Sequence, residues 1–270
     1  MSNTLNFRQL QALKLIDRFN PKCLDGKVAF SAITKEEFLN SMRDLITNPL
    51  GISQGVHPLC GIACVMKIAA ELDPVNLVKM GGYFYANGQY ITRSFLTPPI
   101  KVPTYLKRME PTAGHSAANF ILQATVKSFY NPVTGYNNNP GTKFNEWQGI
   151  TFPVQLRKFL KTYFDIDSVP MRTYRHTIEE IQNKLKEGAT LMAWTSWNQM
   201  KKPGGRFKVL QQHYVIIKNI ERFGTEIHLT IDNPRKTHDK LQLIKFENEK
   251  QCYKALIGVY GFKRKEKVVS

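Results

Sequence analysis

Four side chains of the sequence have the chemistry of an acyl-transfer site, and they occur in a fitting order: Gln54, Cys60, His213 and Asp232. A thiol attacks an acyl carbon as the thiolate, and a nearby imidazole serves as its base. A carboxylate can fix the tautomer of that imidazole, and a side-chain amide can help to stabilise an oxyanion. We therefore interpret Cys60 as the nucleophile, His213 as the base, Asp232 as the orienting residue and Gln54 as an oxyanion donor.

The helix that carries Cys60 is predicted to begin at this residue. The segment CGIACVMKIAAEL, residues 60–72, has no proline and no glycine after Gly61, and its Ala, Met and Leu content favours a buried helix. The N–H groups at a helix N-terminus favour an anion and lower the pKa of a thiol. The sequence therefore predicts a site at the start of this helix where a thiolate forms easily.

His213 and Asp232 are predicted to lie on neighbouring strands of an antiparallel sheet. Runs of β-branched and aromatic residues, separated by polar turns, occur at 189–197, 213–219, 226–232 and 256–262. His213 opens the second run and Asp232 closes the third, so the carboxylate could hold the imidazole. Asn219 and Asn233 are alternative partners, because an amide can replace the carboxylate in this role.

Helices are predicted before Cys60 and on both sides of the long stretch that leads to His213. Apolar spacing predicts amphipathic helices over 7–19 and 36–45, within an N-terminal helical layer over 1–53. Asp73-Pro74 predicts a helix that ends at Gly81-Gly82. A capping box at 177–180 predicts another helix, which ends at Gly188.

The order of these elements predicts a single α+β domain over residues 1–270. Helices come first and strands second, so the helix of Cys60 is expected to pack on a C-terminal antiparallel sheet within 177–262. Residues 82–150 are aromatic and rich in glycine and asparagine, and we interpret them as an irregular insertion. This insertion could wall a substrate cleft or be a structural elaboration.

Other residues that could do chemistry have structural interpretations. We interpret the three other cysteines as packing residues: Cys23, Cys64 and Cys252. His57 could share a metal ion with Cys60, but no third and fourth ligand occur at a fitting spacing, and we expect neither a metal nor a cofactor. Trp194 and Trp197 could pack in the core or form a hydrophobic wall for a substrate side chain.

The order of Gln, Cys, His and an acidic or amide residue resembles that of papain-like cysteine peptidases. More closely, the segment Gln54-Gly-Val-His-Pro-Leu-Cys60-Gly-Ile-Ala-Cys64 resembles the bacteriocin-processing peptidases, the double-glycine peptidase domains of ABC exporters. Their second signature is similar to His213-Tyr-Val-Ile and Asp232-Asn-Pro. The resemblance covers residues 54–72 and 178–234.

The sequence also departs from that family. Leu59 stands where the family usually has Asp, Asn233 is inserted between Asp and Pro, and the stretch from Cys60 to His213 is much longer. Residues 1–270 include no transporter segment. The fold and the mechanism should therefore carry over better than the substrate does.

The resemblance implies a papain-like fold and a thiol protease that cleaves a protein or peptide substrate, after small residues such as Gly-Gly. A solitary domain of this kind is similar to bacterial toxin or effector domains that are delivered into a target cell. A glutamine deamidase, a transglutaminase-like enzyme and a cell-wall amidase are alternatives, because they could use the same residues on other amides.

The charge of the chain favours an acidic partner. Lys and Arg number 38 against 21 Asp and Glu, which gives a formal charge of +17. A non-catalytic protein that binds nucleic acid is therefore another alternative, and a toxin of this charge would have an acidic inhibitor. No long apolar run and no signal peptide occur, so we expect a cytoplasmic protein without a membrane span.

Overall fold

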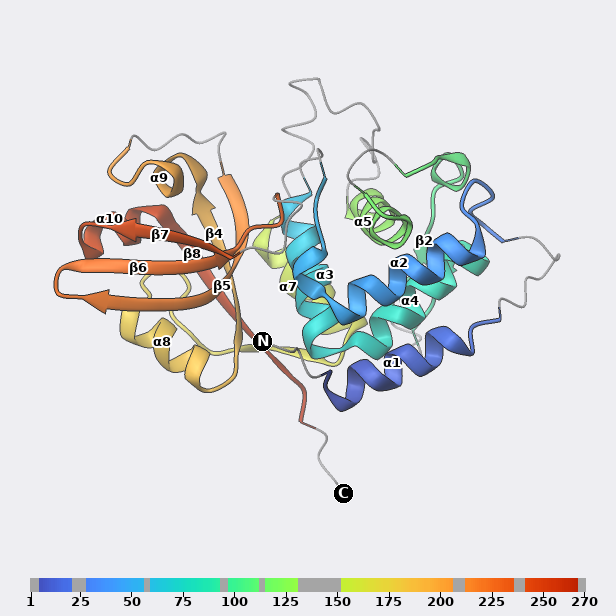
Figure 1. The fold of residues 1–270 in the computed structure, drawn as a ribbon, viewed down its shortest axis with the longest axis horizontal. Coiled ribbons are helices and arrows are strands. Elements are labelled where there is room, and N and C mark those ends of the chain that lie inside the picture. The colour runs from blue at the N-terminus through green and yellow to red at the C-terminus, as the bar shows by residue number, and fades with distance from the viewer. Residues whose placement is uncertain are drawn as a thin grey trace. The chain divides into compact units, whose positions relative to one another are not determined.

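The computed structural model in Figure 1 has an α+β fold, as the sequence predicts, and divides into two compact units, Met1–Asp165 and Ile166–Ser270. It describes residues 5–20, 28–55, 59–92, 97–111, 115–130, 152–205, 212–235 and 241–266. In the described residues the first unit is mainly helical, and the second holds a six-stranded sheet. That residues 1–270 form a single papain-like domain stays a prediction.

The first unit packs its helices around α3, the helix of Cys60. Its helices are α1 (Phe7–Asp17), α2 (Lys35–Thr47), α3 (Cys60–Leu72), α4 (Pro74–Asn87), α5 (Ala117–Tyr130) and α7 (Pro153–Tyr163), with short 3₁₀ helices η1 (Pro49–Gly51) and η2 (Leu106–Arg108). Strands β1 (Gln89–Tyr90) and β2 (Ile100–Lys101) pair with each other. The helix α3 contacts α4, α5 and α7, and all its residues from Gly61 to Ala70 are buried.

The predicted end of α4 at Gly81-Gly82 is wrong. The helix continues to Asn87, and Gly88, with φ of +68°, ends it. A Cβ atom on Gly81 would lie 2.3 Å from the Met42 side chain, and one on Gly82 would lie 2.8 Å from the Phe19 ring. These glycines therefore allow close packing against neighbouring side chains, and they do not terminate the helix.

The helix α5 corrects the prediction of an irregular segment over 82–150. Every residue from Ala117 to Ser128 is buried. A helix that is buried on all sides lacks the alternation of apolar and polar faces by which amphipathic helices are recognised. Residues 131–150 lie outside the described part of the chain.

The second unit is built on an antiparallel sheet with the strand order β3-β8-β4-β5-β6-β7. The strands are β3 (Ile166–Val169), β4 (Thr190–Ser196), β5 (Gln212–Phe223), β6 (Glu226–Asp232), β7 (Gln242–Phe246) and β8 (Leu256–Arg264). The four predicted strands correspond to β4, β5, β6 and β8. The two that the sequence analysis missed, β3 and β7, are the short strands at the edges.

Three helices complete the core of the second unit: α8 (Ile178–Lys186), α9 (Trp197–Lys201) and α10 (Glu249–Ala255). The hydroxyl of Thr177 accepts the N–H of Glu180 at 3.1 Å, which is the first half of the predicted capping box. The carboxylate of Glu180 instead accepts the N–H of Arg172, at 2.8 Å. Buried side chains of all three helices join those of the sheet in one apolar cluster.

Candidate functional site

Cys60 is the first residue of α3, as predicted. The N-cap residue, Leu59, makes no side-chain hydrogen bond to the first turn. Cys60 is partly exposed, whereas Cys64 and Cys252 are buried. Among the described cysteines, Cys60 is therefore the one that a substrate can reach. Cys23 lies outside the described residues.

Gln54 lies in a buried loop between η1 and α3, and α5 anchors that loop. Gln54 itself is only 6% exposed. The preceding carbonyl, of Ser53, accepts the side-chain N–H of Gln123 at 2.8 Å. Gly55, with φ of +59°, follows, and a Cβ atom there would lie 3.0 Å from Nε2 of His115. The backbone conformation and the close contact at position 55 therefore favour glycine. The oxyanion role of Gln54 stays a prediction.

Lys127 is a residue near Cys60 that the sequence analysis missed. It lies on α5, in the same row as Asn119 and Gln123, and all three are buried. Burial lowers the pKa of Lys127 to about 8, and the charge of Cys60 opposes that shift. The spacing of 119, 123 and 127 could have indicated a polar face, but only the surrounding helices show that this face is buried.

The second unit holds His213 by a hydrogen bond to an amide. Nε2 of His213 lies 2.8 Å from Oδ1 of Asn233. The same oxygen accepts the N–H of Arg235 at 3.0 Å, and the amide N–H of Asn233 is directed to Gln242 at 3.3 Å. Oδ1 is therefore an acceptor, so Nε2 of His213 is the donor. In the neutral ring, Nδ1 then carries the lone pair that can accept a proton.

The environment of His213 keeps its ring neutral. Burial lowers the pKa of His213 to about 4; the hydrogen bond to Asn233 opposes this, and the charges of Arg235 and Lys201 add to it. The ring of Trp197 covers it, with centroids 4.7 Å apart and planes inclined by 56°. Trp197 is also part of the apolar cluster of the second unit. It therefore packs in the core and also shields the bond between His213 and Asn233 from water.

Asn233 takes the place that the sequence analysis gave to Asp232 as the partner of His213. In the register between β5 and β6, Asp232 lies opposite Ile216, three residues along the strand from His213. Side chains alternate between the faces of a strand, so Asp232 lies on the face opposite His213. Asn219 directs its side chain to the backbone N–H of Ile220, at 2.9 Å. The structure thus selects one of the two amide alternatives.

The other predicted aromatic residue has a separate place. Trp194 lies on β4 and stacks on Tyr214, with ring centroids 6.4 Å apart and planes inclined by 15°. Its strand pairs with that of His213, with Thr195 opposite His213. Trp194 therefore packs across the strand pair, and Trp197 is the tryptophan that contacts the imidazole.

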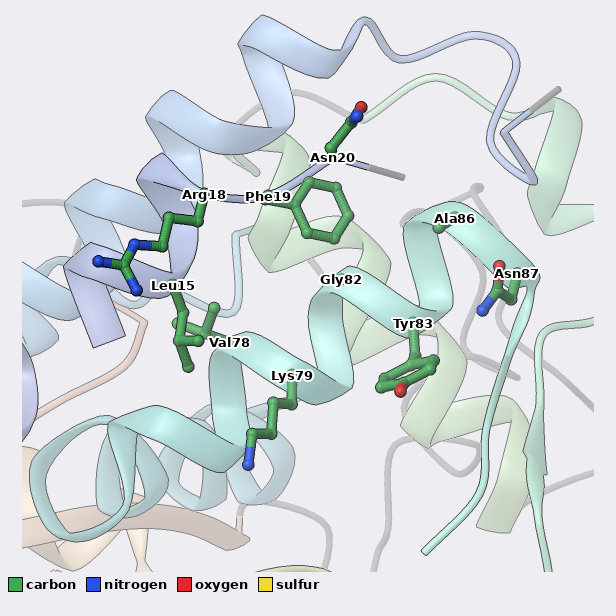
Figure 2. Close-up of a pocket in the computed structure, with 10 residues that line it drawn as sticks. All are labelled: Leu15, Arg18, Phe19, Asn20, Val78, Lys79, Gly82, Tyr83, Ala86 and Asn87. Carbon is green, nitrogen blue, oxygen red and sulfur yellow. The ribbon is translucent and has the colours of Figure 1, made fainter. Parts of the chain in front are cut away.

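A pocket of about 430 Å³ lies elsewhere on the first unit. Figure 2 shows its lining, which comes from the end of α1 and from α4: Leu15, Arg18, Phe19, Asn20, Val78, Lys79, Gly82, Tyr83, Ala86 and Asn87. None of the predicted site residues lines this pocket.

No family model matches the chain, and neither a curated protein nor a solved structure matches it. In the part of the chain that the structure describes, no helix is long and apolar enough to span a bilayer. The same residues contain no group of three or more His, Cys, Asp or Glu that could hold a metal ion. His57, the possible metal ligand named from the sequence, lies outside the described residues.

Proposed function

We propose that the chain is a papain-like cysteine peptidase, in which Cys60 is the nucleophile, His213 the base and Asn233 the residue that orients the base. One observation carries the proposal. The buried hydrogen bond of 2.8 Å between His213 and Asn233 fixes a neutral imidazole with its lone pair on Nδ1. This is the form in which an imidazole accepts the proton of a thiol.

The partly exposed thiol at the start of α3 supplies the other partner of the reaction. The proton of the Cys60 thiol passes to Nδ1 of His213 as Sγ forms a bond to the carbonyl carbon of the substrate. The carbonyl oxygen takes the negative charge, which the N–H of Cys60 and the side-chain amide of Gln54 stabilise. The C–N bond then breaks, and the leaving amine takes the proton from Nδ1.

The second half of the reaction restores the enzyme. His213 takes a proton from a water molecule, which attacks the thioester and releases the acid. The sulfur leaves as a thiolate and recovers the proton from His213. The substrate class, a peptide bond after small residues, and the use as a bacterial toxin or effector rest on the resemblance of the motifs around Cys60 and His213.

The experiment compares the chain with its Cys60→Ala variant on a mixture of peptides from a bacterial extract, read by mass spectrometry. We expect new peptide termini, enriched after glycine, with the chain and none with Cys60→Ala. Cys64→Ala is the matched control, because it removes a thiol from the same helix one turn later, and it should retain the activity.

The products also separate the related reactions. Conversion of glutamine to glutamate without new termini would replace the peptidase by a deamidase that uses the same residues. Equal activity of Cys60→Ala and the unaltered chain would contradict a thiol mechanism altogether.

A further inference from the structure

We propose that the ammonium group of Lys127 is the counter-ion of the Cys60 sulfur and stabilises the negative charge that forms there. The inference rests on Cys60 being the nucleophile of the proposed function, but it does not depend on which bond is cleaved. It concerns only α3 and α5, which pack against each other in the first unit.

Lys127 is a buried cation without a hydrogen bond. It is 3% exposed, and within the described residues its Nζ atom has no hydrogen-bond partner. A buried ammonium group is strongly destabilising unless an anion or an acceptor compensates for the lost water. The contrast with Lys67 on α3 is clear, because the buried ammonium of Lys67 donates to the carbonyls of Leu50 and Pro49 at 2.7 and 3.3 Å.

Cys60 is the group that acts on the charge of Lys127. Burial lowers the pKa of Lys127 to about 8, and among the described residues Cys60 is the one charge that raises it. Other titratable groups lie on the elements packed against α5. They are Lys35, the carboxylates and the arginine of α2; Cys64, Lys67 and Glu71 of α3; Lys79 and the tyrosines of α4; and Lys101 of β2. None of them contributes to the shift in the pKa of Lys127.

The interaction works in both directions. If a thiolate at Cys60 stabilises the ammonium of Lys127, the ammonium stabilises the thiolate by the same free energy. With a pKa of about 8, Lys127 is mostly protonated at neutral pH, so the stabilising charge is present there. The N–H groups of the first turn of α3 favour the same anion.

The positive charge of Lys127 also favours the transfer of the thiol proton to His213. At a pKa of about 4, His213 is a weak base, and transfer of a proton to it from an ordinary thiol is unfavourable by several powers of ten. An ammonium group beside the sulfur reduces this cost because it stabilises the anion that the transfer leaves behind. Lys127 keeps its own proton throughout, so the bonds made and broken in the reaction are unchanged.

The first test measures how fast iodoacetamide labels Cys60 as a function of pH, with mass spectrometry of the Cys60 peptide. We expect Lys127→Met to move the midpoint of labelling to higher pH and to slow labelling at pH 7 by about 10-fold or more. Lys127→Arg, which keeps the charge, should restore much of the rate. Lys67→Met is the matched control, because it removes another buried lysine from the same unit.

An unchanged midpoint in folded Lys127→Met, judged by circular dichroism, would overturn the counter-ion role. This readout does not use a peptide substrate. A shifted midpoint in a chain without peptidase activity would therefore support the counter-ion role while the proposed function failed. An unchanged midpoint in a chain with peptidase activity would support the proposed function and overturn the counter-ion role.

A reciprocal measurement needs no change at Lys127. The titration of its side chain is followed by NMR in the chain labelled with ¹³C-lysine, with and without Cys60→Ala. Loss of the thiol should lower the pKa of Lys127, because the charge of Cys60 raises it. An identical titration in both proteins would show that the two groups do not interact.

Discussion

Nε2 of His213 donates a hydrogen bond of 2.8 Å to Oδ1 of Asn233, under the ring of Trp197. The bond is buried, so it fixes both the orientation and the tautomer of the imidazole. Because the same oxygen also accepts the N–H of Arg235, the backbone after β6 holds the amide in place. The orientation of the proposed base is therefore determined within the second unit.

We predict that Asn233→Ala slows peptide cleavage by about 10²-fold or more, because the imidazole loses the partner that fixes its tautomer. Asn219→Ala is the control, since that side chain bonds to the backbone beside it. Steady-state kcat and KM, with circular dichroism of each variant, provide the measurement. A greater loss of kcat per folded molecule in Asp232→Ala than in Asn233→Ala would return the orienting role to Asp232.

The stability of the protein should fall as the pH falls from about 6.5 to about 4. The pKa of His213 is 6.5 in the unfolded chain, and burial lowers it to about 4 in the folded chain. In that window the unfolded chain binds a proton that the folded chain does not, so acid favours unfolding. Below about pH 4 both states bind it, and the contribution becomes constant.

Urea unfolding of the unaltered chain and of His213→Gln at a series of pH values isolates this contribution. The difference in unfolding free energy should change within the window by an amount on the order of a few kcal/mol. Parallel curves for the two proteins would mean that His213 titrates normally and that its burial does not keep it neutral.

The sequence predicted the elements that carry the site because their local signals are strong. The helix at Cys60 has an uninterrupted run of helix-forming residues, and the strand of His213 is a run of β-branched residues between polar turns. Both signals are properties of the segment itself. The fold class followed from their order along the chain.

Two features of the site depend on tertiary structure and were missed for that reason. Asp232 and Asn233 are adjacent, and only the register of Asp232 opposite Ile216 shows which of them lies on the side of His213. Lys127 belongs to a helix that is buried on every side, so no apolar period revealed the helix or its buried charge. The helix α5 packs against α3, and the charge of Cys60 acts on that of Lys127.

Replacing Lys127 should stabilise the protein at neutral pH. Burial lowers the pKa of Lys127 from 10.5 to about 8, so the folded state holds its charge at a cost. Lys127→Met should raise the free energy of unfolding by roughly 1 to 3 kcal/mol. The unaltered chain should itself gain stability between pH 8 and 10.5, where the unfolded chain binds the additional proton.

Chemical denaturation at pH 7 and pH 10 measures both effects, and Lys79→Met, on the neighbouring α4, serves as a control at an exposed lysine. The advantage of Lys127→Met should shrink at the higher pH, because the folded chain then no longer carries the buried charge. If Lys127→Met instead destabilises the fold at pH 7, the ammonium has a stabilising partner that outweighs its burial.

The last prediction concerns Gln54 and the loop that holds it. An oxyanion donor acts mainly in the transition state, so Gln54→Ala should lower kcat by about 10²-fold or more and leave KM nearly unchanged. Gln123→Leu should also lower kcat, although less, because it removes the hydrogen bond to the carbonyl of Ser53 that anchors the loop. Single-turnover rates per folded molecule, with binding measured on Cys60→Ala, separate chemistry from affinity. A structural role for Gln54 would give a lower melting temperature with an unchanged rate constant, and that outcome would remove Gln54 from the reaction while leaving Cys60 and His213 in place.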